Sequence, residues 1–407
     1  MDIGTTTLAL RLVDLRTGTS AGKWTAVNRQ REWGADVLSR IQKANEGGLG
    51  LLSQSIRAQI AEGIRALCAG AGCAPAAGGR APAAGGRTPA AVGRITVAAN
   101  TTMVHLLLGL SCETLGVVPF TPLTLGPVTV PCRALFDVDC AAEVTVLPGV
   151  STYVGADIVA GIFFSGMYQN NEPSLLLDIG TNGEMALCAD GAITVAATAA
   201  GPAFEGGNIR WGTGSVPGAI SRMRYENGVW AATTIEDRPP VGICGTGLIS
   251  AVWQGLRHGF IASGGNYDPD RVPDKALVLA RNRDGDNITL EQKDIRELQL
   301  AKSAVCSGLG TLLNHAGIDA AAVGALYVAG GFGHNIDYES AAGIGLIPRA
   351  LRSKVRLIGN SALGGAVRCL LDPRSPEELA RIIALSAEYK LSGDRSFNEA
   401  FIENVIF

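Results

Sequence analysis

The stretch from residue 175 to residue 184 reads Leu175-Leu176-Leu177-Asp178-Ile179-Gly180-Thr181-Asn182-Gly183-Glu184. The leucines predict a buried strand, and the polar, glycine-containing residues that follow predict a turn at its end. The four residues Asp-Ile-Gly-Thr occur a second time at Asp2-Ile3-Gly4-Thr5, where Thr6-Thr7 follow. One copy alone is a weak signal, because an aspartate and a glycine after a strand usually form an ordinary turn. The repeat indicates a duplicated fold in which two equivalent strands end in the same kind of turn.

The residue types at these two turns suit a metal-bound phosphate. Asp2 and Asp178 can hold Mg²⁺ through its bound waters, since Mg²⁺ keeps most of its hydration shell. Glycine lacks the Cβ that would keep backbone N–H groups from closing on phosphate oxygens, and threonine hydroxyls add further donors. We therefore predict that the phosphates are bound by the turn residues Gly4, Thr5, Thr6, Thr7, Gly180, Thr181, Asn182 and Gly183.

A different glycine turn follows the apolar run at residues 325–327 and reads Val328-Ala329-Gly330-Gly331-Phe332-Gly333. It suits a flat base or a ribose. The three turns, in this order, resemble those of the actin-like ATPase superfamily, which includes sugar kinases, heat-shock chaperones and acetate kinase. The resemblance implies an α/β fold, a duplicated ribonuclease H-like fold with two subdomains around a nucleotide cleft, and ATP and Mg²⁺ as ligands. It also implies that Gly330, Gly331 and Phe332 contact adenosine.

Five further stretches narrow the resemblance. They are Asn28-x-Gln30-x-x-Trp33-Gly34-x-Asp36-Val37-x-Ser39-Arg40-Ile41, Ala99-Asn100-Thr101-Thr102-Met103-x-His105-Leu106, Gly201-Pro202-Ala203-Phe204-Glu205-Gly206, Gly242-Ile243-Cys244-Gly245-Thr246-Gly247-Leu248-Ile249 and Gln292-Lys293-Asp294-Ile295-Arg296-Glu297-Leu298-Gln299-Leu300-Ala301-Lys302. Over almost the whole chain, these stretches resemble the reductive activators of corrinoid proteins. In that family an ATPase domain drives a low-potential electron onto an inactive Co(II) corrinoid and returns it to Co(I). The resemblance implies ATP hydrolysis with nucleotide-dependent cleft closure, a corrinoid protein as partner, and a homodimer.

Members of that family carry the electron on an N-terminal ferredoxin-like domain with a [2Fe-2S] cluster. Plant-type ligation needs a run such as C-x₄-C-x₂-C, and Cys68 and Cys73 have the first spacing only. The nine cysteines form no C-x-x-C and no cysteine–histidine cluster, so no iron–sulfur cluster is expected in this chain. Only Met1 precedes Asp2, whereas the first strand should supply about five residues before the turn. We interpret the chain as a fragment of a longer protein, and a truncated first strand is the alternative.

Hydrolysis also needs a group that orients the attacking water, because phosphoryl transfer is catalysed mostly by positioning and electrostatics. Glu184 follows the second turn directly, and Glu205 lies in a glycine-flanked loop at residues 201–207. With Asp2 and Asp178 they are the candidate catalytic residues, and the sequence does not choose between the two glutamates.

A polar stripe is expected on the long helix that follows residue 289. Gln299 and Lys302 are three residues apart and share one face of this helix. In the chaperone branch of the superfamily a stripe of this spacing touches adenine, so both residues are candidate nucleotide contacts. A solvated or core-edge face is the alternative.

The repeat predicts two subdomains, residues 1–172 and 173–407, with C-terminal helices packing back on the first. Residues 74–94 form three seven-residue units rich in Ala, Pro and Gly, which predict a low-complexity loop insertion. The pattern Thr289-x-x-Gln292 predicts a capping box that opens the long helix. Asn100 or Thr101 is expected to cap the helix that carries His105, or, from the resemblance, to belong to a segment connecting the subdomains. His105 is expected to be hydrogen-bonded within the fold rather than to bind a metal.

Composition limits the remaining function classes. The chain has 407 residues, 47% of them hydrophobic, and a net charge of −3, which gives no overall basic field for nucleic acid or anionic lipid. No apolar stretch reaches the roughly 20 residues of a membrane helix, and no signal peptide precedes the first turn. We predict a cytoplasmic enzyme that binds neither nucleic acid nor membrane. A small-molecule kinase of the same superfamily and a non-redox, ATP-dependent protein-binding switch are the alternatives.

Overall fold

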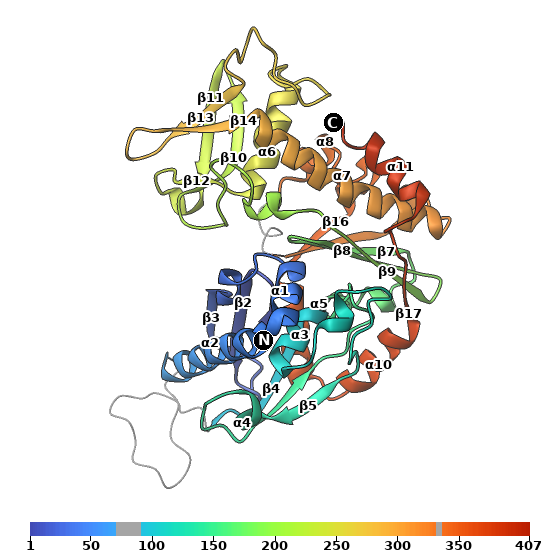
Figure 1. Ribbon diagram of the computed structural model, residues 1–407. Helices are drawn as coiled ribbons and strands as arrows, with labels where there is room; N and C mark the ends of the chain where they lie inside the picture. The colour runs from blue at the N-terminus through green and yellow to red at the C-terminus, as the bar shows by residue number, and fades with distance from the viewer. Residues whose placement is uncertain (71–90, 331–335) are drawn as a thin grey trace. The chain divides into compact units, whose positions relative to one another are not determined.

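The computed structural model describes residues 1–70, 91–330 and 336–407 (Figure 1). The chain divides into two compact units, and each has its own hydrophobic core. The first unit holds Met1–Tyr168 and Ser361–Glu388, and the second holds Gln169–Asn360 and Tyr389–Phe407. Most of the predicted loop at 74–94 lies outside the described residues. Its last residue, Arg94, is already the first residue of a strand.

The first unit is built on a mixed sheet with strand order β3-β2-β1-β4-β6-β5. Its strands are β1 (Asp2–Ile3), β2 (Thr7–Val13), β3 (Ser20–Val27), β4 (Arg94–Ala99), β5 (Val128–Pro131) and β6 (Glu143–Val146). Strand β1 pairs antiparallel with β2 and parallel with β4. The turn that follows Asp2 and Ile3 therefore starts from the middle of the sheet.

Helices cover both faces of this sheet. They are α1 (Val37–Lys43), α2 (Leu49–Gly70), α3 (Thr101–Leu108), α4 (Cys132–Leu135), α5 (Ala156–Ser165), α9 (Ser361–Leu371) and α10 (Ser375–Leu385), and the short β17 (Ser386–Glu388) follows. Ile3, Leu10 and Val97 are fully buried in the core that α2 and α3 close. Helices α5 and α9 pack so closely that a Cβ on Gly365 would lie 2.2 Å from the Ala160 carbonyl oxygen. Only glycine allows this approach.

The second unit contains a sheet in which β16, β15, β7, β8 and β9 lie side by side in that order. The bounds are β7 (Ser174–Ile179), β8 (Gly183–Ala189), β9 (Ala192–Thr198), β15 (Ala325–Ala329) and β16 (Val355–Gly359). Strand β7 pairs parallel with β15 and antiparallel with β8. Parallel pairing places the ends of β7 and β15 at the same edge of the sheet, where Asp178 lies opposite Ala329.

Within the described residues, two small sheets and four α-helices make up most of the rest of the second unit (Figure 1). They are β10 (Ala219–Glu226), β11 (Val229–Thr234), β12 (Gly242–Ile243), β13 (Ala276–Arg281), β14 (Asn287–Glu291), α6 (Gly245–Arg257), α7 (Gln292–His315), α8 (Tyr338–Gly343) and α11 (Arg395–Glu403). The long helix α7 packs against the sheet through β8 and β9, and α11 lies along it.

The predicted capping box at Thr289 is wrong. Thr289 lies within β14, where it pairs with Val278, and α7 begins only at Gln292. The box is formed two residues later by Glu291 and Asp294, and an Asp294 carboxylate oxygen accepts the Glu291 N–H at 2.8 Å. The two patterns overlap in the sequence, and the pairing of β14 with β13 decides which one is used.

The predicted helix cap at residue 100 is confirmed. The Asn100 side-chain oxygen accepts the Met103 N–H at 2.9 Å at the start of α3. Within that helix His105 is fully buried and hydrogen-bonded, as expected. Its Nδ1 lies 2.8 Å from the Thr101 carbonyl oxygen, and the Leu123 N–H donates to Nε2 at 3.0 Å. A carbonyl can only accept, so Nδ1 carries the proton and the ring is held neutral.

We expect His105 to make the first unit sensitive to acid. Burial lowers the pKa of His105 below its ordinary value of 6.5, and the bond to Thr101 opposes this only in part. Because the unfolded chain binds the proton more readily, the contribution of neutral His105 to stability is complete above about pH 6.5 and is lost as the pH falls below it. The urea midpoint should therefore be lower at pH 5.5 than at pH 7.5. His105→Gln should show a smaller fall, at a cost of about 1–3 kcal/mol from the lost buried hydrogen bonds. Equal pH dependence in both proteins would contradict this role.

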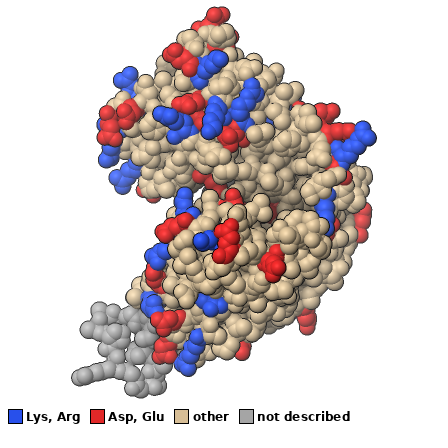
Figure 2. All heavy atoms as spheres, in the orientation of Figure 1, with Lys and Arg blue, Asp and Glu red and all other residues tan. Residues whose placement is uncertain are grey.

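The described residues contain no helix that is both long and apolar enough to cross a membrane. On the face shown in Figure 2, basic and acidic side chains are interspersed, and neither sign forms a continuous field. This matches the small net charge of −3.

Candidate functional site

The turn of the first unit joins β1 to β2 through Gly4, Thr5 and Thr6. The Gly4 N–H donates to the Thr7 carbonyl oxygen at 3.0 Å. A Cβ on Gly4 would lie 2.7 Å from that oxygen, so the turn can close only around glycine. Asp2 and the turn residues through Thr6 are half-buried, and Thr7 is exposed. The turn thus presents its hydroxyls and backbone at an accessible edge of the sheet.

Two fully buried side chains hold the carbonyl groups of this turn. Asn28 donates through Nδ2 to the Gly4 oxygen at 3.0 Å, and Arg40 donates through Nη2 to the Thr5 oxygen at 2.6 Å. Arg40 Nε also donates to the Gly34 oxygen at 2.9 Å. Burial lowers the pKa of Arg40 to about 10. The carbonyl oxygens of Gly4 and Thr5 are therefore both bonded to buried side chains, which restrains the turn.

Two more polar groups of the first unit belong to this site. The Asn100 amide donates to the Thr5 hydroxyl at 3.0 Å, so the residue that caps α3 also holds the turn. Asp157 lies in the first turn of α5, and burial, followed by the nearby charge of Asp2, raises its pKa to about 7. The helix comes close because Gly155 has no side chain, since a Cβ there would lie 2.6 Å from the Asn100 Cα.

The turn of the second unit repeats this arrangement between β7 and β8. The Gly180 N–H donates to the Asn182 carbonyl oxygen at 2.9 Å, and the Thr181 carbonyl oxygen accepts the Gly201 N–H at 2.9 Å. Gly330 lies beside it with φ +97°, and a Cβ on that residue would lie 2.8 Å from Asp178 Oδ1. The last residue of β15 and the glycine after it therefore approach the Asp178 carboxylate directly.

Both candidate glutamates lie at the second turn. The Thr181 hydroxyl donates to Glu205 Oε2 at 2.7 Å, and Glu205 Oε1 would be 3.5 Å from a Cβ on Gly180. Glu184 lies opposite Asp178 in the β7–β8 pair and accepts the Asn182 side-chain amide at 3.3 Å. Residues directly opposite in such a pair project from the same face of the sheet. Asp178, Glu184 and Glu205 therefore surround one turn.

Of the three residues predicted to contact adenosine, only Gly330 lies within the described residues. Gly331 and Phe332 lie outside them. For the described part of this turn, the structure shows that Gly330 directly follows β15 and lies next to Asp178.

Gln299 and Lys302 are buried on α7, where they contact the end of the chain. Gln299 donates through Nε2 to the Val405 carbonyl oxygen at 2.8 Å, and Lys302 donates through Nζ to the Ile406 oxygen at 2.5 Å. Burial lowers the pKa of Lys302 to about 8, and its Nζ lies 5.4 Å from the centre of the Phe407 ring. In this arrangement, both side chains bind the chain's own backbone.

In the part of the chain that the structure describes, no three His, Cys, Asp or Glu side chains gather into a group that could hold a metal ion directly. Each turn instead offers an aspartate at a strand end beside glycine and hydroxyl residues. This donor set fits Mg²⁺ that is held through its own waters and through the phosphates of a ligand.

Sequence reasoning did not assign Asn28, Arg40, Asn100 or Asp157 to the nucleotide site. The first two lie in the stretch at residues 28–41, and their spacing marked a family resemblance without showing which atoms they bind. Asn100 was expected as a helix cap or as part of a segment connecting the subdomains, and its bond to the Thr5 hydroxyl was not expected. Asp157 is a single acidic residue in an apolar helix, which is a local signal for a polar role, but no pattern ties it to Asp2.

Comparisons with known proteins cover the entire length of the chain. The C-terminal domain of RACo, the ASKHA domain, matches residues 172–407, and the RACo middle region matches residues 1–170. The corrinoid activation enzyme RamQ of Eubacterium limosum is 30% identical over 440 residues, which include 100% of this chain and 69% of RamQ. The [Co(II) methylated amine-specific corrinoid protein] reductase of Methanosarcina barkeri is 28% identical over 284 residues, 64% of this chain and 51% of the relative.

Among solved structures, a reductive activator for corrinoid, iron–sulfur protein superposes on this chain with a TM-score of 0.89 and 32% identity. The match includes 100% of this chain and 65% of that protein. The fold expected from the repeated turns is therefore confirmed. This chain spans about two thirds of the length of RamQ and of the solved activator, and about half of the reductase.

Proposed function

The chain belongs to the RACo family, and on this premise we propose that it binds and hydrolyses ATP to drive the reductive reactivation of a Co(II) corrinoid protein to Co(I). The observation that carries the proposal is the pair of equivalent turns after β1 and β7, each with an aspartate, a glycine whose N–H closes the turn, and a threonine hydroxyl. These turns lie in a chain that the two RACo models match at residues 1–170 and 172–407. The names of the relatives supply the corrinoid partner.

The residues present fit ATP and Mg²⁺. Asp2 and Asp178 would hold the metal through its waters, and Mg²⁺ would neutralise the charge that develops on the phosphates. The backbone and hydroxyl groups of residues 4–7 and 180–183 would bind phosphate oxygens. Asn28 and Arg40 contribute by holding the carbonyls of the first turn, which leaves its donors in place before the nucleotide arrives.

The two candidate glutamates, Glu184 and Glu205, have different roles in this proposal. We assign Glu205 to orienting the attacking water, because its two carboxylate oxygens lie against Thr181 and Gly180. We assign Glu184 to fixing the turn through the Asn182 amide.

Glu205→Gln should then lower the turnover of ATP by about 10²-fold with little change in KM, since a residue that orients water acts in the transition state. Glu184→Gln should lower it by about tenfold or less, as expected for the loss of one supporting bond. A larger loss in Glu184→Gln would reverse the assignment. The measurement is steady-state ATP hydrolysis.

ATP can assist this electron transfer only if it changes how tightly the activator binds the different cobalt states of the corrinoid protein. Reduction of Co(II) to Co(I) is unfavourable from ordinary donors, and for a one-electron couple about 59 mV corresponds to a factor of ten in the equilibrium constant. A nucleotide shifts such an equilibrium only if the ATP-bound activator binds one state of the corrinoid protein more tightly. We therefore propose that ATP changes the affinity of this chain for the Co(II) form.

The proposed function is tested by measuring ATP hydrolysis by the purified chain alone, with a Co(II) corrinoid protein, and with the same protein in its Co(III) form. We expect hydrolysis to rise several-fold with the Co(II) form and not with the Co(III) form. With a low-potential chemical reductant present, ATP should also increase the yield of Co(I). The absorbance of the Co(I) corrinoid measures this yield. Hydrolysis that is indifferent to the cobalt state would contradict the proposal and favour an ATP-dependent switch for another partner.

Three further expectations accompany this proposal. Nucleotide-dependent closure and a homodimer are both implied by the family resemblance, and X-ray scattering with and without ATP, together with the molar mass in solution, checks them. A location in the cytoplasm is likewise a prediction, and fractionation of cells checks it.

A further inference from the structure

The C-terminal segment, Asn404–Phe407, covers the face of α7 whose side chains were predicted as nucleotide contacts. It follows α11, which lies along α7 (Figure 1). The segment begins where the Asn404 amide donates to the Ser307 hydroxyl at 3.0 Å. It then runs toward the start of α7, where Gln299 and Lys302 donate to its carbonyl oxygens. All of these residues belong to the second unit.

The C-terminal segment is held mainly through its backbone. Its carbonyl oxygens accept the bonds from α7, and the Phe407 N–H donates to the Ser263 carbonyl oxygen at 2.9 Å. The side chains of the segment are half-buried or exposed, and Ile406 is 58% exposed. Because water can replace such bonds and little apolar surface is buried, the segment can leave α7 at a small cost in stability.

Backbone surrounds Gln299 and Lys302 on their other sides. Gly265 has φ +82°, and a Cβ on it would lie 2.4 Å from Gln299 Oε1. Gly345 has φ +74°, and a Cβ on it would lie 3.3 Å from Lys302 Nζ. The Gly264 carbonyl oxygen also accepts from Gln299 Nε2, at 3.3 Å. A new partner for these two side chains can therefore enter where the C-terminal segment lies.

A nucleobase can take over the bonds that the C-terminal segment makes. Adenine offers ring nitrogens as acceptors in place of the carbonyl oxygens, and its amino group can donate to the amide oxygen of Gln299. Lys302 faces the Ile406 carbonyl group and the Phe407 ring, which are both neutral. Burial lowers the pKa of Lys302 to about 8, so its ammonium group is incompletely compensated. A ligand with stronger acceptors would compensate it better.

The same helix also passes the second phosphate turn. A Cβ on Gly183 would lie 3.1 Å from Val305 Cγ2, so α7 touches the turn at this residue. Val305 follows Lys302 by three residues, roughly 4.5 Å along the helix. A nucleotide with its phosphates at the second turn therefore has Lys302 within reach of its adenosine.

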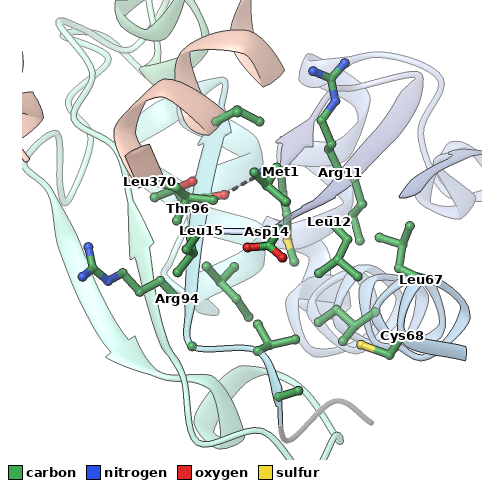
Figure 3. Close-up of a pocket in the computed structure, with 18 of the residues that line it drawn as sticks. Met1, Arg11, Leu12, Asp14, Leu15, Leu67, Cys68, Arg94, Thr96 and Leu370 are labelled. Carbon is green, nitrogen blue, oxygen red and sulfur yellow. Dashed lines mark hydrogen bonds between the residues drawn. The ribbon is translucent and has the colours of Figure 1, made fainter. Parts of the chain in front are cut away.

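A groove of about 450 Å³ in the first unit is a separate cavity (Figure 3). Leu12, Leu67 and Leu370 are among the residues that line it. It opens at the end of β2 and β4 that lies away from the first phosphate turn. The 6 residues of β4 span roughly 20 Å at about 3.3 Å per residue. The groove is therefore remote from the first turn, in contrast to the contact of α7 with the second.

We propose that the C-terminal segment competes with the adenosine of ATP for Gln299 and Lys302, leaves α7 when ATP binds, and returns when the nucleotide departs. This inference rests on the proposed function, because it takes ATP as the nucleotide. The apparent affinity for ATP is then reduced in proportion to the fraction of chains whose α7 face is uncovered. By linkage, ATP and the bound position of the segment oppose each other.

The first test compares the 407-residue chain with a version that lacks residues 404–407. The probes are a non-hydrolysable ATP analogue and inorganic triphosphate, both with Mg²⁺, and titration calorimetry measures their Kd. We expect the analogue to bind the shortened chain about tenfold more tightly, because the competing segment is gone. Inorganic triphosphate carries the phosphates without a base, so it should bind both chains equally.

Amide exchange in the complete chain gives a second measurement that needs no variant. The C-terminal segment should exchange about tenfold faster with the ATP analogue bound, and at its original rate with inorganic triphosphate.

Two substitutions serve as a matched pair. Asn404→Ala removes the bond to Ser307 and should tighten binding of the analogue about twofold, because it favours release of the segment. Ile402 is 73% exposed on α11, so Ile402→Ala should leave the Kd unchanged.

The two probes distinguish failure of this inference from failure of the proposed function. Equal or weaker binding of the analogue to the shortened chain, or unchanged or slower exchange of the segment with the analogue bound, would overturn the inference. Binding of the analogue would still support the nucleotide site. If neither the analogue nor inorganic triphosphate binds the complete or the shortened chain, the proposed function fails and this inference fails with it.

Discussion

Asp178→Asn is expected to lower the turnover of ATP by about 10²- to 10³-fold, the usual cost of removing a group that stabilises charge in a transition state. Asp178 is the second-last residue of β7, lies opposite Glu184, and is approached by the backbone of Gly330. Asparagine has nearly the same shape but no charge, so the turn should keep its form while the attraction for Mg²⁺ is lost. The measurement is ATP hydrolysis at a series of Mg²⁺ concentrations, with the urea midpoint recorded for the same protein.

The matched control for this variant is Asp190→Asn. Asp190 is exposed, lies in the turn at the other end of β8, and has φ +50°, a conformation that asparagine adopts readily. The control should keep full turnover. If Asp178→Asn hydrolyses ATP as fast as this control, the assignment of Asp178 to the metal fails, and with it the mechanism proposed for the second turn.

Much of the fold could be predicted because the repeated Asp-Ile-Gly-Thr is a local signal. A buried strand followed by glycine and hydroxyl residues indicates a strand and its turn without any knowledge of distant contacts. The cap at Asn100 was equally local. The box predicted at Thr289 was wrong because strand pairing, a tertiary interaction, extended β14 to Glu291.

The candidate site was harder to predict because its supporting residues come from distant parts of the chain. Asp157 is related to Asp2 only through the packing of α5 against the start of α3, which Gly155 permits. The spacing of Gln299 and Lys302 correctly placed them on one face of α7, but spacing cannot say what that face touches. In the structure it touches the backbone of Val405 and Ile406.

Arg40→Met is expected to lower the free energy of unfolding by about 1–3 kcal/mol or more, the cost of leaving buried hydrogen-bonding groups without their partner. The Arg40 guanidinium donates to the carbonyl oxygens of Gly34 and Thr5, and its Nη1 lies 3.4 Å from Gln30 Oε1. Methionine fills part of the space but leaves these buried acceptors without a donor. Arg40→Lys should recover little, because an ammonium group cannot reach acceptors that a planar guanidinium bridges. Equilibrium urea unfolding measures the loss.

The same variant separates stability from function in the first turn. Arg31 is exposed and lies in the same stretch, so Arg31→Met should change the free energy of unfolding by no more than about 0.5 kcal/mol. If Arg40 positions the turn, Arg40→Met should also lose ATP turnover under conditions in which both variants are fully folded. This follows because its bond to the Thr5 carbonyl holds the backbone that presents Gly4 and Thr5. Full turnover in folded Arg40→Met would restrict Arg40 to stabilising the fold. The first turn would then be positioned by the side chains of Asn28 and Asn100 without Arg40.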